Sequence, residues 1–237
     1  QAARHFLGLS IFVSFALALL GLSANGLIMQ LLGAQPEVIG LALPYSNLIF
    51  LVIPFTVLLA VLSSILQGTG DTKTPMYAMI MVNVLHIAIA YPLIYGQWGL
   101  PAFGVKGAAV AVGIAEATGS LFLFSRCRRI LKPSKRLRLD LIHTIWQVGA
   151  PVSGERIVQQ AGILLYTKIV LLYGTVAYAA HQVGLSIESL SFLPGYGFAI
   201  AAATMVGQSI GAGKYTRAKL ENWEANRLAT FIMSAMG

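Results

Sequence analysis

The chain contains 237 residues, of which 57% are hydrophobic and only 10% are charged. A soluble domain carries about 25% charged residues, so this composition excludes an ordinary water-soluble protein. The formal net charge of +8 would suit a nucleic-acid partner, but the sequence has no basic stripe interleaved with stacking aromatic residues, so we expect no such partner. The single cysteine, Cys127, falls in a basic stretch that we expect to be a loop, and one cysteine cannot form an internal disulfide.

Long segments without charge predict helices that cross a membrane. Residues 5–36, 38–70 and 74–105 contain no Asp, Glu, Lys or Arg, and residues 169–213 contain only Glu188. Each segment exceeds the ~20 apolar residues that cross a hydrocarbon core. The sequence therefore predicts an all-α fold, a polytopic transmembrane helix bundle. Its helices are expected at residues 6–32, 41–67, 76–95, 104–125, 143–172 and 178–209, with a seventh beginning near 220.

Basic residues on alternate loops indicate how these helices are oriented. One side of the membrane collects most of the Lys and Arg, including seven within residues 126–138. The positive-inside rule places that side, with loop 126–140, in the cytoplasm of a plasma or inner membrane protein. We expect a cytoplasmic linker at 128–140, which joins part of an amino-terminal lobe (1–127) to part of a carboxy-terminal lobe (141–237). Its charges could serve only as a topology anchor or could also bind lipid headgroups.

Small residues and prolines predict how the helices pack and bend. Small residues at every fourth position let helix backbones approach closely in lipid. The fourth predicted helix has two such stripes, Ala109, Gly113 and Ala117, and Ala111, Ala115 and Gly119. Prolines interrupt three other predicted helices, where each could be a static kink or a hinge. They are Pro44, Pro54, Pro92 and Pro194.

Three carboxylates, Glu116, Glu155 and Glu188, fall near the middle of predicted spans. Ionisable side chains at that depth are costly and commonly mark ion or substrate pathways. Glu155 is the leading candidate to bind a proton or Na⁺. With the hydrocarbon core beginning near Trp146, Glu155 lies about 14 Å inside it at ~1.5 Å per residue, close to the midplane. Arg156 points about 100° away from it around the helix and could pair elsewhere or line a cavity. The helical face of Glu155 also carries Pro151, Gln159, Gly162 and Tyr166.

Several motifs occur in an order and spacing that resemble the multidrug and toxic compound extrusion (MATE) family. They are LLGAQPEV (31–38), QGTGDTKTP (67–75), FGVKGAAVA (103–111), VGAPVSGE (148–155), AAHQVG (179–184) and MVGQSIGAGKYTRA (205–218). By this resemblance, the predicted spans correspond to the third through eighth helices of a twelve-helix protein and the start of the ninth. The chain would then be a fragment, and the missing helices of its own chain would be its partners.

The resemblance implies a function. Members of the family export organic cations and other drugs in exchange for Na⁺ or H⁺, by rocking two lobes around a central cavity. This chain would then be part of a cation-coupled antiporter, with drug-like small molecules and the lipid bilayer as further partners. Glu155 would be the glutamate of the cation site. Asn83 would support a site in the first lobe, although Ile87 stands where some members have an aspartate.

Other residues are expected to line the substrate cavity: Glu188, Arg156, Gln159, Tyr166 and Glu116. Both Glu116 and Glu188 could instead have structural roles. A flippase for lipids or lipid-linked precursors, from the same superfamily, is the alternative function, and it should show a cavity lined by basic residues. GQSIG at 207–211 matches a hydrolase pattern but would lie at the end of a membrane helix. We therefore expect no enzyme activity, no bound metal, and no cofactor besides the coupling ion.

Overall fold

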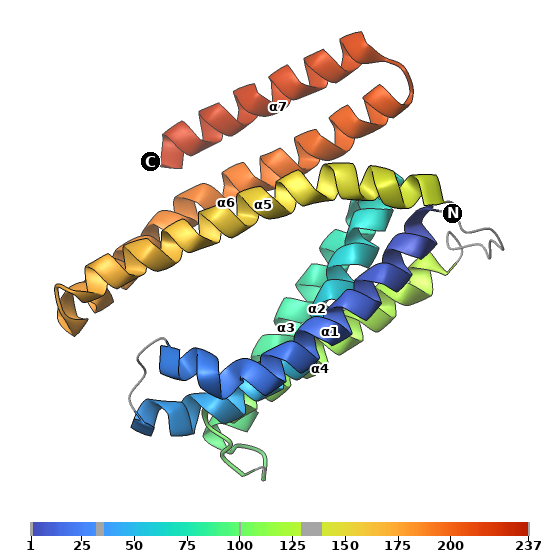
Figure 1. The fold of residues 1–237 in the computed structure, drawn as a ribbon. Coiled ribbons are helices and arrows are strands. Elements are labelled where there is room, and N and C mark those ends of the chain that lie inside the picture. The colour runs from blue at the N-terminus through green and yellow to red at the C-terminus, as the bar shows by residue number, and fades with distance from the viewer. Residues whose placement is uncertain (1, 32–35, 100, 129–138, 237) are drawn as a thin grey trace. The chain divides into compact units, whose positions relative to one another are not determined.

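The computed structural model describes residues 2–31, 36–99, 101–128 and 139–236. Every regular element in these ranges is a helix, which confirms the predicted all-α fold (Figure 1). The helices are α1 (Ala2–Leu31), α2 (Pro36–Gly68), α3 (Lys73–Tyr95), α4 (Val105–Cys127), α5 (Leu139–Leu171), α6 (Thr175–Gly211) and α7 (Tyr215–Met236). Each corresponds to one predicted helix. The ends differ by a few residues, and α7 begins five residues earlier than expected.

Four of the described helices are long and apolar enough to cross a membrane: α1, α2, α3 and α4. The two segments of α6, Val176–Leu190 and Phe192–Gly211, pass the same test as a bent pair inclined at 45°. Pro194 lies just beyond the bend, and a proline there removes the hydrogen bond to the carbonyl of Leu190. The described residues of α5, where a span was also predicted, do not meet the same requirements of length, hydropathy and low charge.

The chain divides into two compact units, Gln1–Lys135 and Arg136–Gly237. The division falls inside the predicted linker 128–140, most of which lies outside the described residues. The lobe boundaries and the cytoplasmic placement of this linker therefore stay predictions. Each unit is described below by itself.

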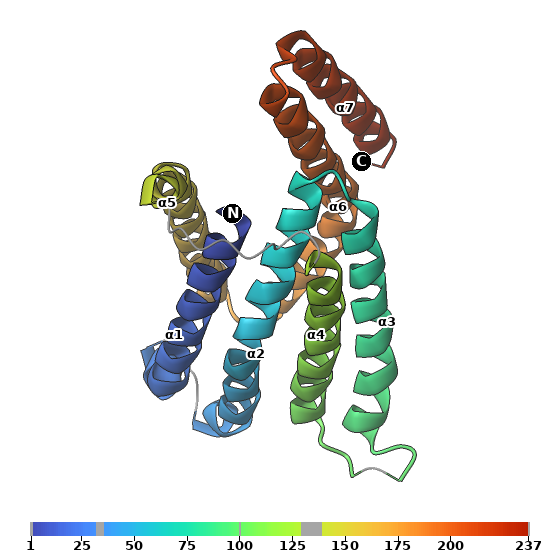
Figure 2. The ribbon, with the colours of Figure 1, turned by 90° about the vertical axis from the view of Figure 1, so that its right-hand side faces the viewer.

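The first unit is a row of four helices in which sequence neighbours are not always spatial neighbours. Helix α1 packs on α2, α2 packs on α4, and α4 packs on α3, so that α4 separates α2 from α3 over most of their length (Figure 2). The core of this unit comes from α2, α3 and α4. It comprises Leu59, Leu62, Leu66, Ala78, Val82, Ala115, Leu123 and Cys127.

Cys127 contradicts one expectation. It is the last residue of α4 and is fully buried, rather than part of a basic loop. Its Sγ lies 3.8 Å from the backbone oxygen of Leu62 in α2. A free thiol packs as a small apolar group with a weak S–H donor, and Cys127 accordingly belongs to the core cluster formed by α2, α3 and α4.

Glycines in α4 allow the close packing that the small-residue stripes predict. A Cβ on Gly107 would lie 2.7 Å from the backbone oxygen of Leu93 in α3, and a Cβ on Gly113 would lie 2.9 Å from Val52 Cγ2 in α2. A Cβ on Gly119 would collide with the side chain of Val82. The alanines Ala111 and Ala115 are fully buried. The stripes therefore hold α4 tightly against both neighbours, as expected for helices packed in lipid.

In the turn between α2 and α3, Asp71 caps the start of α3. Its carboxylate accepts hydrogen bonds from the backbone N–H of Thr74 at 2.9 Å and from the Thr74 hydroxyl at 2.6 Å. These bonds hold the pKa of the Asp71 carboxyl below its ordinary value, with the Thr74 hydroxyl as the largest cause. Gly70 supplies the positive φ of 93° that reverses the chain just before this cap.

The second unit contains α5, α6 and α7. Helix α6 packs along α7, whereas α5 touches α6 over a much shorter stretch. At the turn between α6 and α7, the Ser209 hydroxyl donates to one carboxylate oxygen of Glu221 at 2.6 Å, and Arg217 Nε donates to the other at 2.8 Å. This network joins the end of α6 to the first turns of α7.

Candidate functional site

Glu155 lies at the centre of α5. It is the middle residue of this 33-residue helix, and its side chain is exposed. It forms no hydrogen bond or ion pair with any residue that the structure describes. A carboxylate in this position keeps its acceptor lone pairs available for a proton or a cation.

The neighbouring Arg156 pairs with Gln159 instead of with a carboxylate. Arg156 Nη1 donates to Gln159 Oε1 at 3.0 Å, and both side chains are exposed. The two residues are three positions apart, so one helical turn brings them together. Arg156 was expected to pair elsewhere or to line a cavity. Among the described residues, its partner is Gln159 on the same helix.

Tyr166 contacts the next helix. Its ring lies edge-on to the ring of His181 in α6, with centroids 5.2 Å apart and planes inclined at 67°. Half of Tyr166 is exposed, at 52%, while His181 Nε2 is buried and has no hydrogen-bond partner among the described residues. Sequence reasoning singled out Tyr166 but missed His181, whose only signal was its place in the AAHQVG motif.

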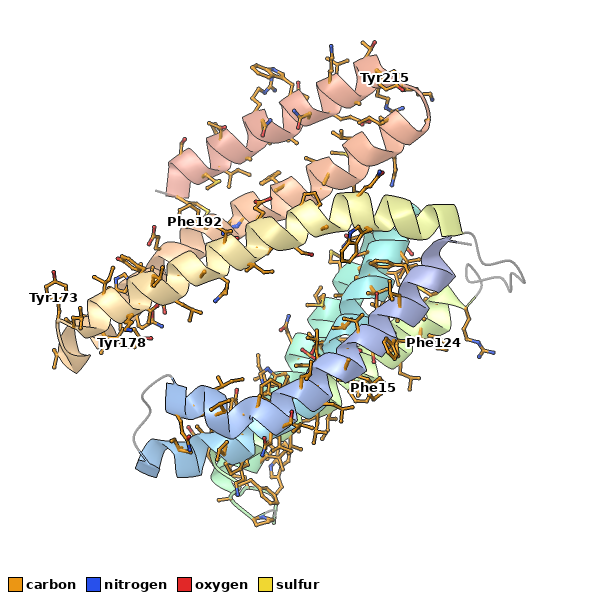
Figure 3. All side chains as sticks on the ribbon, in the orientation of Figure 1. Phe15, Phe124, Tyr173, Tyr178, Phe192 and Tyr215 are labelled. Atoms are coloured by element: carbon orange, nitrogen blue, oxygen red, sulfur yellow. The ribbon has the colours of Figure 1, made fainter. Side chains whose placement is uncertain are left out.

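Glu188 lies in a groove along α6. The groove has a volume of about 430 Å³, and its other lining residues are mostly apolar or aromatic: Leu185, Ser189, Phe192, Leu193 and Tyr196. Their spacing of three, four and seven residues places them on one face of the helix. Figure 3 labels Phe192, whose side chain projects from α6. The face therefore combines one carboxylate with two aromatic rings.

The structure does not bring Glu155 and Glu188 together. The rings of Tyr166 and His181 join α5 to α6 near their turn, whereas α6 bends by 45° between Leu190 and Phe192, just beyond Glu188. Away from their turn the two helices diverge (Figure 2), so no contact joins the carboxylates.

In the first unit, Asn83 and Glu116 have different surroundings. Asn83 is exposed on α3 and makes no side-chain hydrogen bond within the described ranges. Glu116 is partly buried on α4, where its Oε2 accepts a hydrogen bond from the hydroxyl of Thr56 in α2. Thr56 was not singled out from the sequence, because a lone threonine in an apolar helix commonly bonds to its own backbone.

A second polar cluster in the first unit was also missed. Asn25 in α1 is only 2% exposed, and its Nδ2 donates to Ser46 Oγ and to Asn47 Oδ1 in α2, both at 2.8 Å. The Ser46 hydroxyl also lies 2.8 Å from the backbone oxygen of Ala42. The signal was present in the sequence as polar residues in two successive apolar helices. Hydrogen bonds of this kind hold membrane helices together.

No set of three or more His, Cys, Asp or Glu side chains able to hold a metal ion occurs among the residues that the structure describes. The candidate groups are single carboxylates with hydroxyl, amide or aromatic neighbours. Such groups can bind a proton or attract a cation.

The sequence profile of the MatE family matches residues 1–92 and 151–236. A probable multidrug resistance protein NorM of Thermotoga maritima is 38% identical over 66% of this chain and 35% of its own length. A probable multidrug resistance protein YoeA of Bacillus subtilis is 31% identical over 81% of this chain and 43% of its own length. The chain thus spans about a third to a half of the curated relatives that it matches.

Solved structures support the same fold. A crystal structure of MATE in complex with MaD5 superimposes with a TM-score of 0.83 over 98% of this chain and 53% of that chain, at 24% identity. A MOP superfamily transporter from Pyrococcus furiosus, described as having a binding pocket of reverse polarity, gives a TM-score of 0.84 at 24% identity, over 98% of this chain and 52% of that chain. The helices match, and the sequence profile covers most of the chain in two segments. The chain therefore belongs to the MatE family, as the order of its motifs indicated.

Proposed function

We propose that this chain forms part of a cation-coupled antiporter that exports small organic, often cationic, compounds across the plasma or inner membrane. The observation that carries the proposal is Glu155, an exposed carboxylate at the centre of α5 without an ion-pair partner among the described residues. The names of the relatives, which describe multidrug resistance proteins, support the class of function.

In this proposal Glu155 binds the coupling ion, which is Na⁺ or H⁺. An unpaired carboxylate within a membrane protein is stable only when a proton or a cation compensates its charge. Alternation between the loaded and empty states would therefore change how favourably α5 sits in the membrane. Asn83 would contribute in the first unit as a neutral side chain, whose amide oxygen can accept a hydrogen bond or contact a cation.

The groove around Glu188 is the proposed contact surface for the exported compound. A lipophilic cation gains from burial against apolar side chains, from the faces of aromatic rings and from a carboxylate. Glu188 with Phe192 and Tyr196 offers these three features on one face of α6. Tyr166, the pair of Arg156 and Gln159, and Glu116 would line the remainder of the substrate pathway.

The balance of charge favours a drug exporter over a flippase for anionic lipid precursors. Three carboxylates occupy the central parts of α4, α5 and α6, against the single guanidinium of Arg156. Cationic compounds are attracted to such a surface, while phosphate groups are repelled. The proposal includes no catalytic activity. It also places loop 126–140 in the cytoplasm, by the positive-inside rule.

Efflux of ethidium from cells that express the complete gene tests the proposal. Glu155→Gln keeps the size of the side chain and removes its charge, so ion-driven efflux is expected to fall by at least tenfold at equal expression. Glu224→Gln is the matched control, because Glu224 is an exposed carboxylate on α7 whose partner is Arg227 at 3.5 Å. Reconstitution with imposed Na⁺ or H⁺ gradients identifies the ion. Unchanged efflux in Glu155→Gln would remove this residue from the coupling mechanism.

A further inference from the structure

Thr56 in α2 and Glu116 in α4 meet partway along their helices, outside the apolar core of the first unit, where Thr56 is exposed and Glu116 is partly buried. Glu116 is the middle residue of the 23-residue apolar segment Val105–Cys127, and Thr56 lies one residue past the middle of the 27-residue segment Ala42–Gly68. The Thr56 hydroxyl donates to Glu116 Oε2. Both groups therefore lie near the middle of apolar segments long enough to cross a membrane, where an isolated carboxylate is most unfavourable.

The packing of α2 against α4 creates this contact. Val52 lies one turn before Thr56, and Gly113 lies three residues before Glu116; a Cβ on Gly113 would lie only 2.9 Å from Val52 Cγ2. One turn further on, Leu59 reaches Gly119. The absent side chains of the two glycines thus let the helices approach on both sides of the contact, which fixes Thr56 and Glu116 at the same level.

The Thr56 hydroxyl has two acceptors but one hydrogen. Besides Glu116 Oε2, the backbone oxygen of Val52 lies 3.4 Å from Thr56 Oγ1. When Glu116 is ionised, the hydroxyl must donate to the carboxylate. When Glu116 is protonated, its own O–H can donate to Thr56 Oγ1, and the hydroxyl is free to turn towards Val52. Each protonation state of Glu116 therefore has a satisfied set of hydrogen bonds within this pair of helices.

Among the described residues, no charged side chain forms an ion pair with Glu116. Helix α2 carries no Lys, Arg or His. On α3 the titratable side chains are Lys73, Tyr77, His86, Tyr91 and Tyr95. His86 is the one at the level of Glu116, as the contacts of Gly107 with Leu93 and of Gly119 with Val82 show. No hydrogen bond or ion pair joins His86 to Glu116 in the described part of the chain.

We propose that Glu116 and Thr56 form a proton-binding site in the first unit, separate from Glu155. On loading, a carboxylate oxygen of Glu116 forms an O–H bond with a proton delivered by water; on release, that bond breaks and the proton returns to water. A proton suits the site better than a metal ion, because hard cations require several oxygen ligands and this site has two oxygen-bearing side chains. This site rests on the proposed transport function, to which it adds a second carboxyl that binds a proton. Its test measures proton binding and does not require transport.

Infrared difference spectroscopy of the purified protein, expressed from its complete gene, tests the site directly. Spectra at acidic and alkaline pH are subtracted, so that each carboxyl that binds a proton contributes one C=O stretching band. Glu116→Gln is expected to remove one band. Thr56→Val keeps the shape of the side chain but removes the acceptor, so the same band should persist and shift to higher frequency. Thr56→Ser keeps the hydroxyl and should leave the band in place.

Two controls separate this site from its surroundings. Glu155→Gln should remove a different band, and His86→Gln should leave the Glu116 band unchanged. Loss of efflux in Glu155→Gln with this band intact would leave the proton site standing, whereas unchanged efflux there would overturn only the proposed coupling role of Glu155. The proton site is overturned if Glu116→Gln loses no band, or if Thr56→Val leaves the band unshifted. The proton site would also be overturned if Glu116 bound Na⁺ instead of a proton. In that case a carboxylate band would respond to Na⁺ at alkaline pH and disappear in Glu116→Gln, with no C=O stretching band from Glu116 at acidic pH.

Discussion

Replacement of Gly107 by alanine is the sharpest test of how the first unit packs. The added Cβ would lie 2.7 Å from the Leu93 oxygen, 2.8 Å from the Leu93 carbonyl carbon and 3.1 Å from its Cβ. The first two are backbone atoms, which cannot turn away as a flexible side chain could. Ordinary van der Waals contact begins at 3.4 Å. Helices α3 and α4 must therefore separate by about 0.7 Å at this point, the difference between 3.4 and 2.7 Å.

A gap of this size has a predictable effect on stability. A radial gap of about 0.5–1 Å forfeits roughly a quarter to a half of the dispersion attraction between the atoms concerned, and overpacking of this kind destabilises a protein by about 1–3 kcal/mol. Gly107→Ala should lower the free energy of unfolding by that amount, measured by denaturant titration of the purified protein in detergent micelles. The readout is the circular dichroism of the helices.

Gly26→Ala in α1 is the matched control, since a Cβ at Gly26 meets nothing within 4 Å among the described atoms. Alanine is a better helix former than glycine by about 0.5–1 kcal/mol, so this variant should be neutral or slightly more stable. Equal stability of Gly107→Ala and Gly26→Ala would refute the conclusion that the backbones of α3 and α4 touch at Gly107.

Two further variants and one labelling experiment address single contacts in the first unit. Asp71→Ala removes the cap on α3 and should lower the free energy of unfolding by about 0.5–2 kcal/mol. Because the pKa of Asp71 is lowered in the folded state, its contribution is present above the ordinary aspartate pKa and disappears as the pH falls through the lowered value, which unfolding titrations over acidic pH can follow. Asn25→Ala removes the hydrogen bonds that join α1 to Ser46 and Asn47 in α2 and should cost about 1–3 kcal/mol, measured by thermal unfolding. The buried thiol of Cys127 should react with a maleimide far more slowly in the folded protein than after denaturation.

The controls use neighbouring positions. Thr72→Ala should leave the cap intact, because the Thr72 side chain makes no capping hydrogen bond. Ser23→Ala removes only a bond to the backbone of its own helix, so it should be much milder than Asn25→Ala. A cysteine at Arg128, in a Cys127→Ser background, should label quickly, since Arg128 is exposed. Rapid labelling of Cys127 in the folded protein would contradict its burial. The cap would be contradicted if the free energy of unfolding of Asp71→Ala fell at acidic pH as it does in the unmodified protein.

The helices could be predicted from the sequence because charge-free runs of this length have few alternatives in a membrane. The stripes containing Gly113 and Gly119 also predicted close packing, since small residues leave a gap that only another helix fills. By contrast, the order of the helices in the first unit was not predictable. Adjacent helices usually pack together, and nothing in the short turn after α2 indicates that α4 lies between α2 and α3.

The sequence indicated which individual residues are candidates for the site, but it did not indicate which residues contact one another. An apolar helix makes a carboxylate such as Glu116 conspicuous, whereas its partner Thr56 is a common residue with several possible bonding partners. Cys127 was misplaced for a related reason. The sequence locates the basic run well, but where α4 ends depends on its packing against Leu62. Partners across helices depend on register and rotation, which hydropathy alone does not encode.

The order of the four helices in the first unit also bears on how the protein is assembled. Helices α1 and α2 are neighbours in sequence and in space, so they can associate as soon as both have entered the membrane. Helix α3 then enters without its main neighbour, because α4 has not yet been synthesised. During that interval the lipid must solvate the future interface of α3, including Val82 and the carbonyl of Leu93. Once α4 has been synthesised, its interfaces with α2 and with α3 can form together.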